Sequence, residues 1–416
     1  MATAGIAAPN AIEQIGVGRK LLEELAVKVI YLAGEILVRD LAQQMCVSLV
    51  IAGELFNRLR REALCEVTGM AGSVHRIALT TQGRGRALEL LALNQYTGPA
   101  PVSLTDYIQK VRTQSVIDLE VRPEMVEKAL QHLVIEKTTI RQLGTAVVSG
   151  KSVFLYGSTG SGKSSIAESL GGLFSQDAIW LPHAVAVDGQ IITVFDPLVH
   201  TRIGGDTPSS HDGRWVRCRR PRLMVGGELT IEMLDLQFNP VTKYYSAPVQ
   251  MKANNGLLII DDFGRQRLRP EELLNRWVVP LDRRIDFLTL SGGKKIEIPF
   301  DMFVVFATNI DPASLVDEAF LRRLNTKVKV DTVTPEQFHE ISRRVCRHLG
   351  LGYDPAIVDE LIDTIRTQVK LPLRACYPRD VMQQICWTAR YDGRAPVLTR
   401  EAVLQACRNY FVAPTS

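Results

Sequence analysis

Short, unbroken apolar runs mark the middle of the chain. Val153–Tyr156 leads into a glycine-rich stretch, Leu257–Ile260 ends in two acids, and Phe303–Ala307 is followed by Thr308 and Asn309. Runs of this length are typical of strands that are buried on both faces of a parallel sheet. The pattern predicts an α/β fold in which polar residues follow the carboxyl ends of the strands, where such sheets bind ligands.

The N-terminal part of the chain shows helical spacing interrupted by polar turns. Three helices, a strand and a last helix are expected at Leu21–Ala33, Glu35–Met45, Leu49–Leu64, His75–Leu79 and from about Arg86. This order resembles a winged helix-turn-helix domain, and the fragment RIALTTQGRGRALELL is similar to the wing and last helix of that family. The resemblance implies an α+β domain that precedes the predicted sheet.

The remaining boundaries follow from linkers and hydrophobic spacing. A proline-rich linker begins at Gly98, and Thr334-Pro-Glu-Gln337 is a good helix start with a capping residue, a proline and a capping-box glutamine. Hairpins are predicted at Val185–Phe195 and Ile285–Ile298. The expected parts are a winged helix at 1–97, a linker at 98–122, an α/β core at 123–330 with a long insertion at about 181–252, and a helical lid at 331–416.

The glycine-rich stretch matches a phosphate-binding loop. It reads Gly157-Ser-Thr-Gly-Ser-Gly-Lys163-Ser164, with a predicted strand before it and a predicted helix after it. The glycines let backbone N–H groups point inward, and the helix N-terminus favours the same anion. Lys163 supplies a cation for the β- and γ-phosphates, and the Ser164 hydroxyl can ligate Mg²⁺. The residues predicted to bind a nucleoside triphosphate are Gly157, Ser158, Thr159, Gly160, Ser161, Gly162, Lys163, Ser164 and Ser165.

Two acids follow the second apolar run. Asp261 and Asp262 stand at the carboxyl end of Leu257–Ile260, which places them beside the phosphate loop in a parallel sheet. We expect Asp261 to hold the Mg²⁺ shell and Asp262 to orient or deprotonate the attacking water. The alternative is a turn whose acids are merely solvated, and the phosphate loop upstream argues against it.

Composition and charge narrow the class of protein only a little. The hydrophobic fraction of 46% and the charged fraction of 23% are those of a globular protein, and a net charge of +4 neither demands nor excludes nucleic acid. The seven scattered cysteines contain no C-x-x-C pair, which fits reduced thiols in a cytoplasm. Lys28 and Glu35 interrupt the richest apolar stretch, so no segment is expected to span a membrane.

Two stretches bear on nucleic-acid binding. The segment Arg214–Arg222, with Trp215 among its arginines, can contact nucleic acid or an acidic chain, and a solvated face between subunits is an equal alternative. A DNA-reading helix begins with polar and basic side chains, whereas the corresponding helix here begins Ser48-Leu-Val-Ile-Ala-Gly. We therefore expect the N-terminal domain to contact protein or support oligomers rather than read DNA.

The order of motifs resembles the AAA+ ATPases over residues 123–413. The shared features are a phosphate loop, an apolar strand ending in Asp-Asp, a strand ending in Thr-Asn, the run Ala-Phe-Leu-Arg-Arg, and a C-terminal helical lid. The insertion, Ala253-Asn-Asn-Gly and the hairpin before Phe303 are most similar to the branch that contains MoxR-type ATPases, magnesium chelatase subunits and MCM helicases. The resemblance implies a three-layer α/β domain that binds ATP and Mg²⁺.

Further site residues are implied by this resemblance alone. Asn309 matches the first sensor, which positions water; Arg323 matches the arginine finger, with Arg322 as neighbour or substitute; and Arg379 matches the second sensor of the lid. A finger that reaches the next subunit's nucleotide implies a homo-oligomeric ring or spiral, most often of six subunits in this family. Phosphoryl transfer depends on positioning and charge neutralisation, which suits these residue types.

One departure from the family concerns Asp262, where glutamate is usual. The shorter side chain sets the carboxylate about 1 Å back, and misplacement of that size slows catalysis. The sequence thus predicts a cytoplasmic ATPase that remodels a protein client in the manner of a MoxR-like chaperone. The alternatives are a DNA-acting motor or regulator, and a slowly hydrolysing nucleotide-dependent scaffold.

Overall fold

The computed structural model describes residues 6–174, 177–204, 211–315, 322, 324 and 326–411. The chain forms two compact units. The first comprises Met1–Leu119, Phe174–Leu258 and Arg267–Phe303, and the second comprises Glu120–Leu173, Ile259–Gln266 and Val304–Ser416. Every predicted nucleotide-site residue that the structure describes belongs to the second unit. The domain boundaries expected from the sequence stay predictions.

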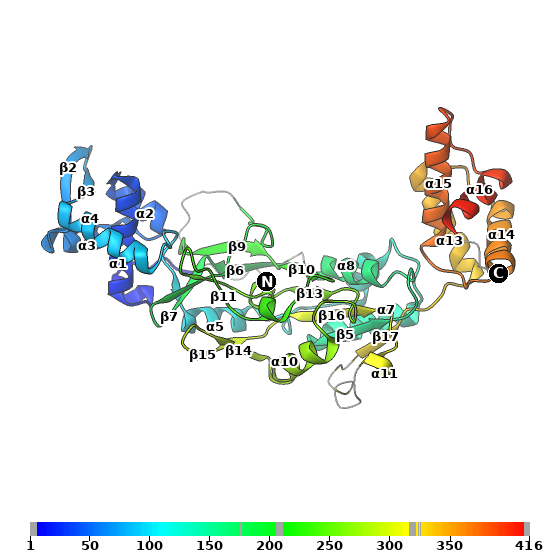
Figure 1. Cartoon of the computed structure of the whole chain (residues 1–416), viewed down its shortest axis with the longest axis horizontal. Coiled ribbons are helices and arrows are strands. Elements are labelled where there is room, and N and C mark those ends of the chain that lie inside the picture. The colour runs from blue at the N-terminus through cyan, green and yellow to red at the C-terminus, as the bar shows by residue number, and fades with distance from the viewer. Residues whose placement is uncertain are drawn as a thin grey trace. The chain divides into compact units, whose positions relative to one another are not determined.

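The N-terminal segment of the first unit combines helices with one small antiparallel sheet of order β1-β3-β2. Its elements are η1 (Ile12–Ile15), α1 (Arg19–Ala33), β1 (Glu35–Leu37), α2 (Val38–Met45), α3 (Leu49–Arg61), β2 (Cys65–Ala71), β3 (Val74–Leu79) and α4 (Thr81–Leu93) (Figure 1). The helices predicted near α1 and α3 and the strand predicted near β3 are present.

Local packing explains where this segment departs from the sequence prediction. The predicted helix Glu35–Met45 starts only at Val38, because Ile36 is buried and pairs with Ile77 in the sheet. The strand β2 is not evident from the sequence, since its side chains are mostly exposed and its pairing with β3 defines it. Helix α4 starts at Thr81 rather than near Arg86, because the Thr80 side chain caps it by accepting from the Gly83 N–H.

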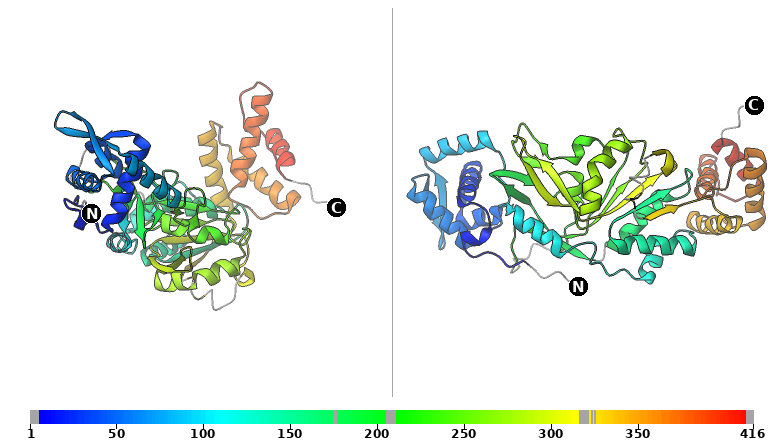
Figure 2. Two further views of the ribbon diagram at one scale, coloured as in Figure 1. Left: turned by 60° about the vertical axis from the view of Figure 1, so that its left-hand side comes forward. Right: turned by 90° about the horizontal axis from the view of Figure 1, so that it is seen from below.

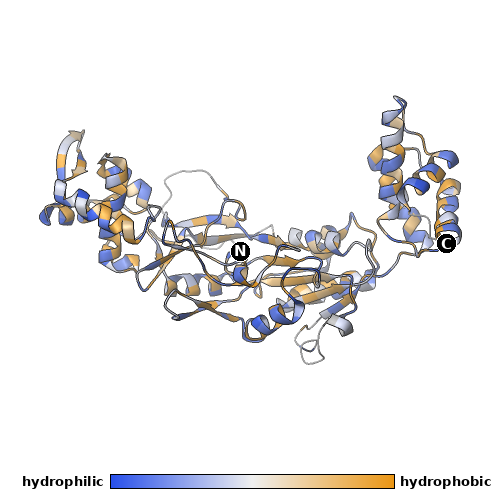
Figure 3. Ribbon diagram, viewed as in Figure 1, coloured by the Kyte–Doolittle hydropathy of each residue, from blue (hydrophilic) through white to orange (hydrophobic). Residues whose placement is uncertain are grey.

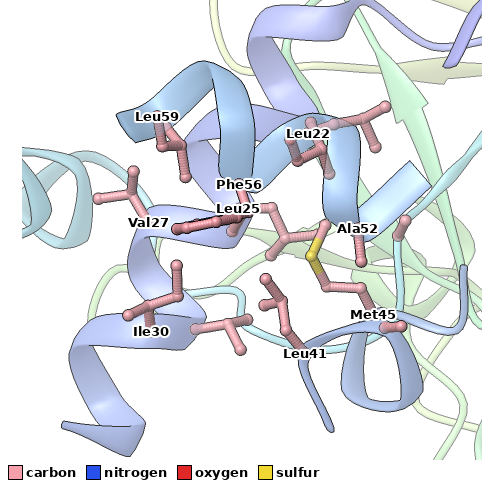
Figure 4. Packing of buried hydrophobic residues seen from close by; sticks show 14 of the residues in the cluster. Leu22, Leu25, Val27, Ile30, Leu41, Met45, Ala52, Phe56 and Leu59 are labelled. Atoms are coloured by element: carbon pink, nitrogen blue, oxygen red, sulfur yellow. The ribbon is translucent and has the colours of Figure 1, made fainter. Parts of the chain in front are cut away.

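One hydrophobic cluster holds these helices together. Figure 4 shows Leu22 and Leu25 of α1, Met45 of α2 and Phe56 of α3 packed side by side, each at most 2% exposed. The Ser48 side chain accepts from the Ile51 N–H and so fixes the start of α3. Helical spacing of apolar residues, which the sequence displays, is therefore what builds this core.

The rest of the first unit contains the insertion and two hairpins. Its elements are β4 (Val102–Ser103), α5 (Leu104–Thr113), β6 (Ala178–Pro182), β7 (Ala184–Val187), β8 (Gln190–Thr193), β9 (Trp215–Arg219), β10 (Arg222–Val225), η2 (Ile231–Leu234), β11 (Gln237–Phe238), β12 (Tyr245–Ser246), α9 (Val249–Lys252), α10 (Pro270–Arg283), β14 (Ile285–Thr289) and β15 (Lys295–Pro299). Both predicted hairpins are confirmed, as antiparallel pairs β7–β8 and β14–β15. Strands of this part form a five-stranded sheet of order β11-β12-β8-β7-β4.

The basic run in the insertion is not one exposed surface. Arg214 and Arg220 are 4% and 7% exposed, and Trp215 belongs to the hydrophobic core at 5%. Arg214 forms an ion pair with Asp212 and also donates to the carbonyl oxygens of Ile15 and Pro101. Trp215 therefore fills the core, and the nucleic-acid or acidic-chain contact expected of Arg214–Arg222 stays a prediction for the exposed arginines alone.

The central sheet carries the phosphate loop and has the strand order β10-β13-β16-β5-β17. Strand β5 pairs in parallel with β16 and with β17. The elements not yet given are α6 (Pro123–Leu130), α7 (Lys137–Ser149), β5 (Ser152–Tyr156), α8 (Lys163–Phe174), β13 (Leu257–Ile260), β16 (Phe303–Thr308), α11 (Pro312–Leu315) and β17 (Thr326–Lys329). The aromatic rings of Phe154, Phe263 and Phe306 pack together beside β5. The parallel P-loop α/β fold expected from the sequence is confirmed.

The C-terminal segment is helical, as predicted. It contains α13 (Pro335–Leu349), α14 (Pro355–Asp363), η3 (Thr364–Val369), α15 (Tyr377–Tyr391) and α16 (Arg400–Tyr410), drawn in orange to red in Figure 2. Thr334 and Gln337 form the expected capping box at the start of α13. Helices in this segment carry both hydrophobic and hydrophilic residues (Figure 3), and the apolar faces enclose a core that includes Phe338, Val381 and Ile385.

Two further expectations concern membranes and thiols. Among the described residues, no helix is long and apolar enough to cross a bilayer. All seven cysteines are free thiols.

Candidate nucleotide site

The phosphate loop lies between the end of β5 and the start of α8. Gly157, Gly160 and Gly162 have φ angles of +145°, +76° and +97°, which residues with side chains rarely adopt. A Cβ atom at Gly157 would also overlap the carbonyl oxygen of Val330. Gly157 therefore has both a conformational and a steric requirement for glycine, and the buried strand β5 fixes where the loop begins.

Lys163 is folded into the loop and is 8% exposed. Its ammonium group donates to the carbonyl oxygens of Gly157 at 3.0 Å and Ser158 at 2.8 Å. Burial lowers the pKa of Lys163, the Arg374 charge lowers this pKa further, and the carboxylates of Asp261 and Asp262 oppose both effects. The ammonium group is thus held at the loop, where it supplies a positive charge for a phosphate.

The two residues predicted to hold Mg²⁺ are brought together. The Ser164 hydroxyl donates to the Asp261 carboxylate at 3.0 Å, although the two residues are far apart in sequence. A hydroxyl and a carboxylate oxygen are hard donors that suit Mg²⁺, which takes its other ligands from water and phosphate oxygens. The backbone N–H of Asp262 and the Gln266 amide also bond to Asp261 and hold it in place. These residues therefore fit a magnesium ion.

Asp262 lies at the same edge of the sheet in a less common backbone conformation. Its φ angle is +49°, in the left-handed region that Asp tolerates better than most residues. The residue is exposed, and its carboxylate has no hydrogen bond or ion pair with the part of the chain that the structure describes. The side chain is thus free to accept a proton or a hydrogen bond from water.

Asn309 follows β16, which lies between β5 and β13 in the sheet. Its amide donates to the Thr159 hydroxyl at 3.1 Å, so the predicted sensor touches the phosphate loop. Three buried polar atoms near the loop have no hydrogen-bond partner among the described residues: Ser158 Oγ, Asn309 Oδ1 and Arg374 Nε. Buried polar atoms are usually satisfied, so this cluster is typical of a site that awaits a polar ligand.

The predicted arginines differ in what the structure says of them. Arg379 lies in the first turn of α15, where its side chain is 60% exposed and forms an ion pair with Asp380 at 2.9 Å. Arg322 is exposed. Arg323 lies outside the described residues. The catalytic roles expected for these arginines stay predictions.

The sequence reasoning overlooked two residues near the loop, Arg374 and Cys376. The Cys376 N–H donates to the Gly160 carbonyl oxygen at 3.1 Å. A Cβ atom at Gly160 would lie 2.5 Å from the Cys376 sulfur and 3.6 Å from the Arg374 Cδ. Neither residue belongs to a motif with a defined spacing, and only the fold brings them to the loop.

Comparisons with known proteins add the following findings. Residues 334–409 match the model of a domain of unknown function, DUF8689. No curated protein matches the chain. The structure is similar to the Thermotoga maritima RuvB Holliday junction branch migration motor, at 13% identity and a TM-score of 0.39 over 66% of this chain and 69% of that chain. It is also similar to domain III of the Thermotoga maritima replication initiation protein DnaA, at 12% identity and a TM-score of 0.38 over 70% of this chain and 99% of that chain. The strand order of the central sheet and the phosphate loop after β5 define the fold.

Proposed function

We propose that this chain is a Mg²⁺-dependent AAA+ ATPase of the MoxR-like kind, which works as a ring-shaped homo-oligomer and remodels a protein partner. The observation that carries the nucleotide part of the proposal is the contact between Ser164 and Asp261 beside a buried Lys163. Two motifs that are distant in sequence meet there. They bring together the oxygen donors, the cation and the glycine-rich loop that a Mg²⁺-bound triphosphate requires.

Each residue of the site has a separate role in the proposed ATP hydrolysis. Loop amides and Lys163 would bind the β- and γ-phosphates, and Ser164 and Asp261 would hold the Mg²⁺, which would neutralise developing charge. Asp262 orients the attacking water and accepts its proton, and the free Oδ1 of Asn309 offers that water a second acceptor. An arginine of the neighbouring subunit, proposed as Arg323, completes the charge stabilisation.

Features of the N-terminal domain favour a protein as its partner. The order of its elements is compatible with the winged helix proposed for it, and its α3 begins with Leu49 and Val50, which are 52% and 66% exposed. Exposed apolar side chains at this end suit contact with protein better than reading of base edges. The turn before α3 is also covered, because Cys46 lies against Gly213 of the insertion.

The DNA-acting alternative rests on exposed arginines of α3 and β9. Arg60 and Arg61 are exposed on the last turn of α3, and Arg217 and Arg219 are exposed on β9. Arginines that neutralise DNA phosphates release counterions, so the affinity of the chain for DNA would fall steeply with salt. The scaffold alternative rests on Asp262, whose short carboxylate favours slow hydrolysis.

The deciding experiment measures ATP turnover by the full chain with and without duplex DNA, together with its mass in the presence and absence of Mg·ATP. The proposal expects turnover that needs Mg²⁺, does not depend on DNA, and accompanies assembly into a ring. Turnover that depends on DNA would favour the DNA-acting alternative. Assembly with Mg·ATP and no turnover would favour the scaffold.

A further inference from the structure

Two arginines of the C-terminal helical segment, Arg374 and Arg379, are candidates for binding the phosphates of the nucleotide. We propose that Arg374, and not Arg379, is the arginine of this segment that binds the triphosphate. The inference rests on the proposed nucleotide site and names one more residue of it. It differs from the assignment that the AAA+ resemblance implies, because that assignment follows a sequence motif and the fold brings a different arginine to the loop.

The backbone around Arg374 is fixed to the phosphate loop and to the segment after β17. On one side, the Val333 N–H donates to the Leu373 carbonyl oxygen at 3.1 Å. On the other side, the Cys376 N–H donates to the Gly160 carbonyl oxygen at 3.1 Å. Arg374 therefore projects from a stretch that is held at both ends, and its Cδ lies 3.6 Å from the position of a Cβ at Gly160.

The guanidinium group of Arg374 has no anionic partner among the described residues. Its Nε is buried without a hydrogen bond, and its Cζ lies 5.7 Å from the centre of the Tyr377 ring. The aromatic face orients the group but does not neutralise it. Lys163, a second cation, is close enough for the Arg374 charge to lower its pKa. Two neighbouring cations and unsatisfied donors at a phosphate loop are complementary to a polyanion.

Arg379 is engaged elsewhere. Its Nε donates to one carboxylate oxygen of Asp380 at 2.9 Å, and the Tyr410 hydroxyl donates to the other at 2.8 Å. Arg379 would have to give up this ion pair to reach a phosphate, whereas Arg374 gives up no hydrogen bond made within the described chain. Because an exposed pair contributes little energy, the distinction between the two arginines is that Arg379 already has an anionic partner and Arg374 has none among the described residues.

The test compares binding of Mg·ATP and Mg·ADP by the full-length protein in calorimetric titrations. Three variants are needed: Arg374→Ala, Arg379→Ala and, as a remote control, Arg394→Ala, whose side chain is exposed and paired with Asp392. Losing a charge-assisted contact to phosphate should weaken ATP binding by about tenfold or more in Arg374→Ala. Arg379→Ala and Arg394→Ala should bind ATP with affinities close to wild type.

The outcomes separate this inference from the proposed function. Arg374→Lys should recover part of the lost affinity, which a merely structural role for the guanidinium would not give. If Arg379→Ala loses ATP affinity and Arg374→Ala does not, the inference is wrong, while the nucleotide site stands. If wild type and Lys163→Ala bind Mg·ATP equally poorly, the proposed function itself fails.

Discussion

The buried ion pair between Asp212 and Arg214 gives a sharp prediction about the insertion. Arg214 donates to both carboxylate oxygens of Asp212 and to the backbone oxygens of Ile15 and Pro101. The pair thus joins the insertion to the N-terminal segment and to the linker within the first unit. We expect Arg214→Met to destabilise this unit strongly, although the sequence suggests an exposed basic run.

The size of the effect follows from burial. The side chains of Arg214 and Asp212 are only 4% and 3% exposed, so truncation leaves a carboxylate that water cannot solvate. Removing one partner of such a pair costs about 3–5 kcal/mol of unfolding free energy. Replacing both, as Asp212→Leu with Arg214→Met, should restore most of this loss, because no charge then remains buried.

Guanidinium unfolding followed by tryptophan fluorescence can measure the change. Trp180, Trp215 and Trp277 are buried in the first unit, so their emission reports mainly on it. Arg219→Met is the matched control, because Arg219 is exposed at the end of β9, the strand that follows Arg214, and this substitution should cost about 0.5 kcal/mol or less. A loss of under about 1 kcal/mol in Arg214→Met would refute the reasoning.

Three further predictions concern turnover, assembly and pH. Asp262→Asn should leave ATP affinity intact and reduce turnover by about 100-fold or more, because an amide cannot accept the water's proton; a wild-type rate in an ATPase assay would move this role to another residue. Mixed subunits of Arg323→Ala and Lys163→Ala should regain part of the ATPase activity, because a shared interface can then carry one intact finger and one intact lysine; confirmed co-assembly without rescue would contradict a finger that acts between subunits. Burial lowers the pKa of Lys28 from 10.5 to about 8, so above pH 8 the folded state releases a proton that the unfolded chain keeps. Unfolding free energy should therefore rise between pH 8 and 10 in wild type relative to Lys28→Met, and parallel curves would contradict this assignment.

Within the candidate nucleotide site, the sequence predicts the local structure wherever a motif fixes both residue type and spacing. The loop from Gly157 to Ser164 is local, and its flanking strand and helix appear where the pattern places them. The meeting of Ser164 with Asp261 was also predictable, because parallel strands bring their carboxyl ends to one edge.

Other features depend on tertiary packing that no single stretch encodes. Arg374 approaches the loop because the chain folds back through Cys376 to Gly160, and no pattern in Leu373–Cys376 indicates this contact. The arginines of Arg214–Arg222 look alike in sequence. Alternation along β9 exposes Arg217 and Arg219, whereas Arg214 and Arg220, on either side of this strand, are buried and donate to backbone carbonyl oxygens. Burial of polar groups is decided by their partners, which the sequence does not locate.

The central claim is that the loop around Lys163 binds a Mg²⁺-bound triphosphate. Calorimetric titration of the full chain with Mg·ATP tests it directly, with Lys163→Ala as the variant and Lys151→Ala, an exposed lysine just before β5, as the control. The account predicts that wild type and Lys151→Ala bind with matching affinity, and that Lys163→Ala binds at least about tenfold more weakly. Equal affinities in all three proteins, or no binding in any of them, would contradict it.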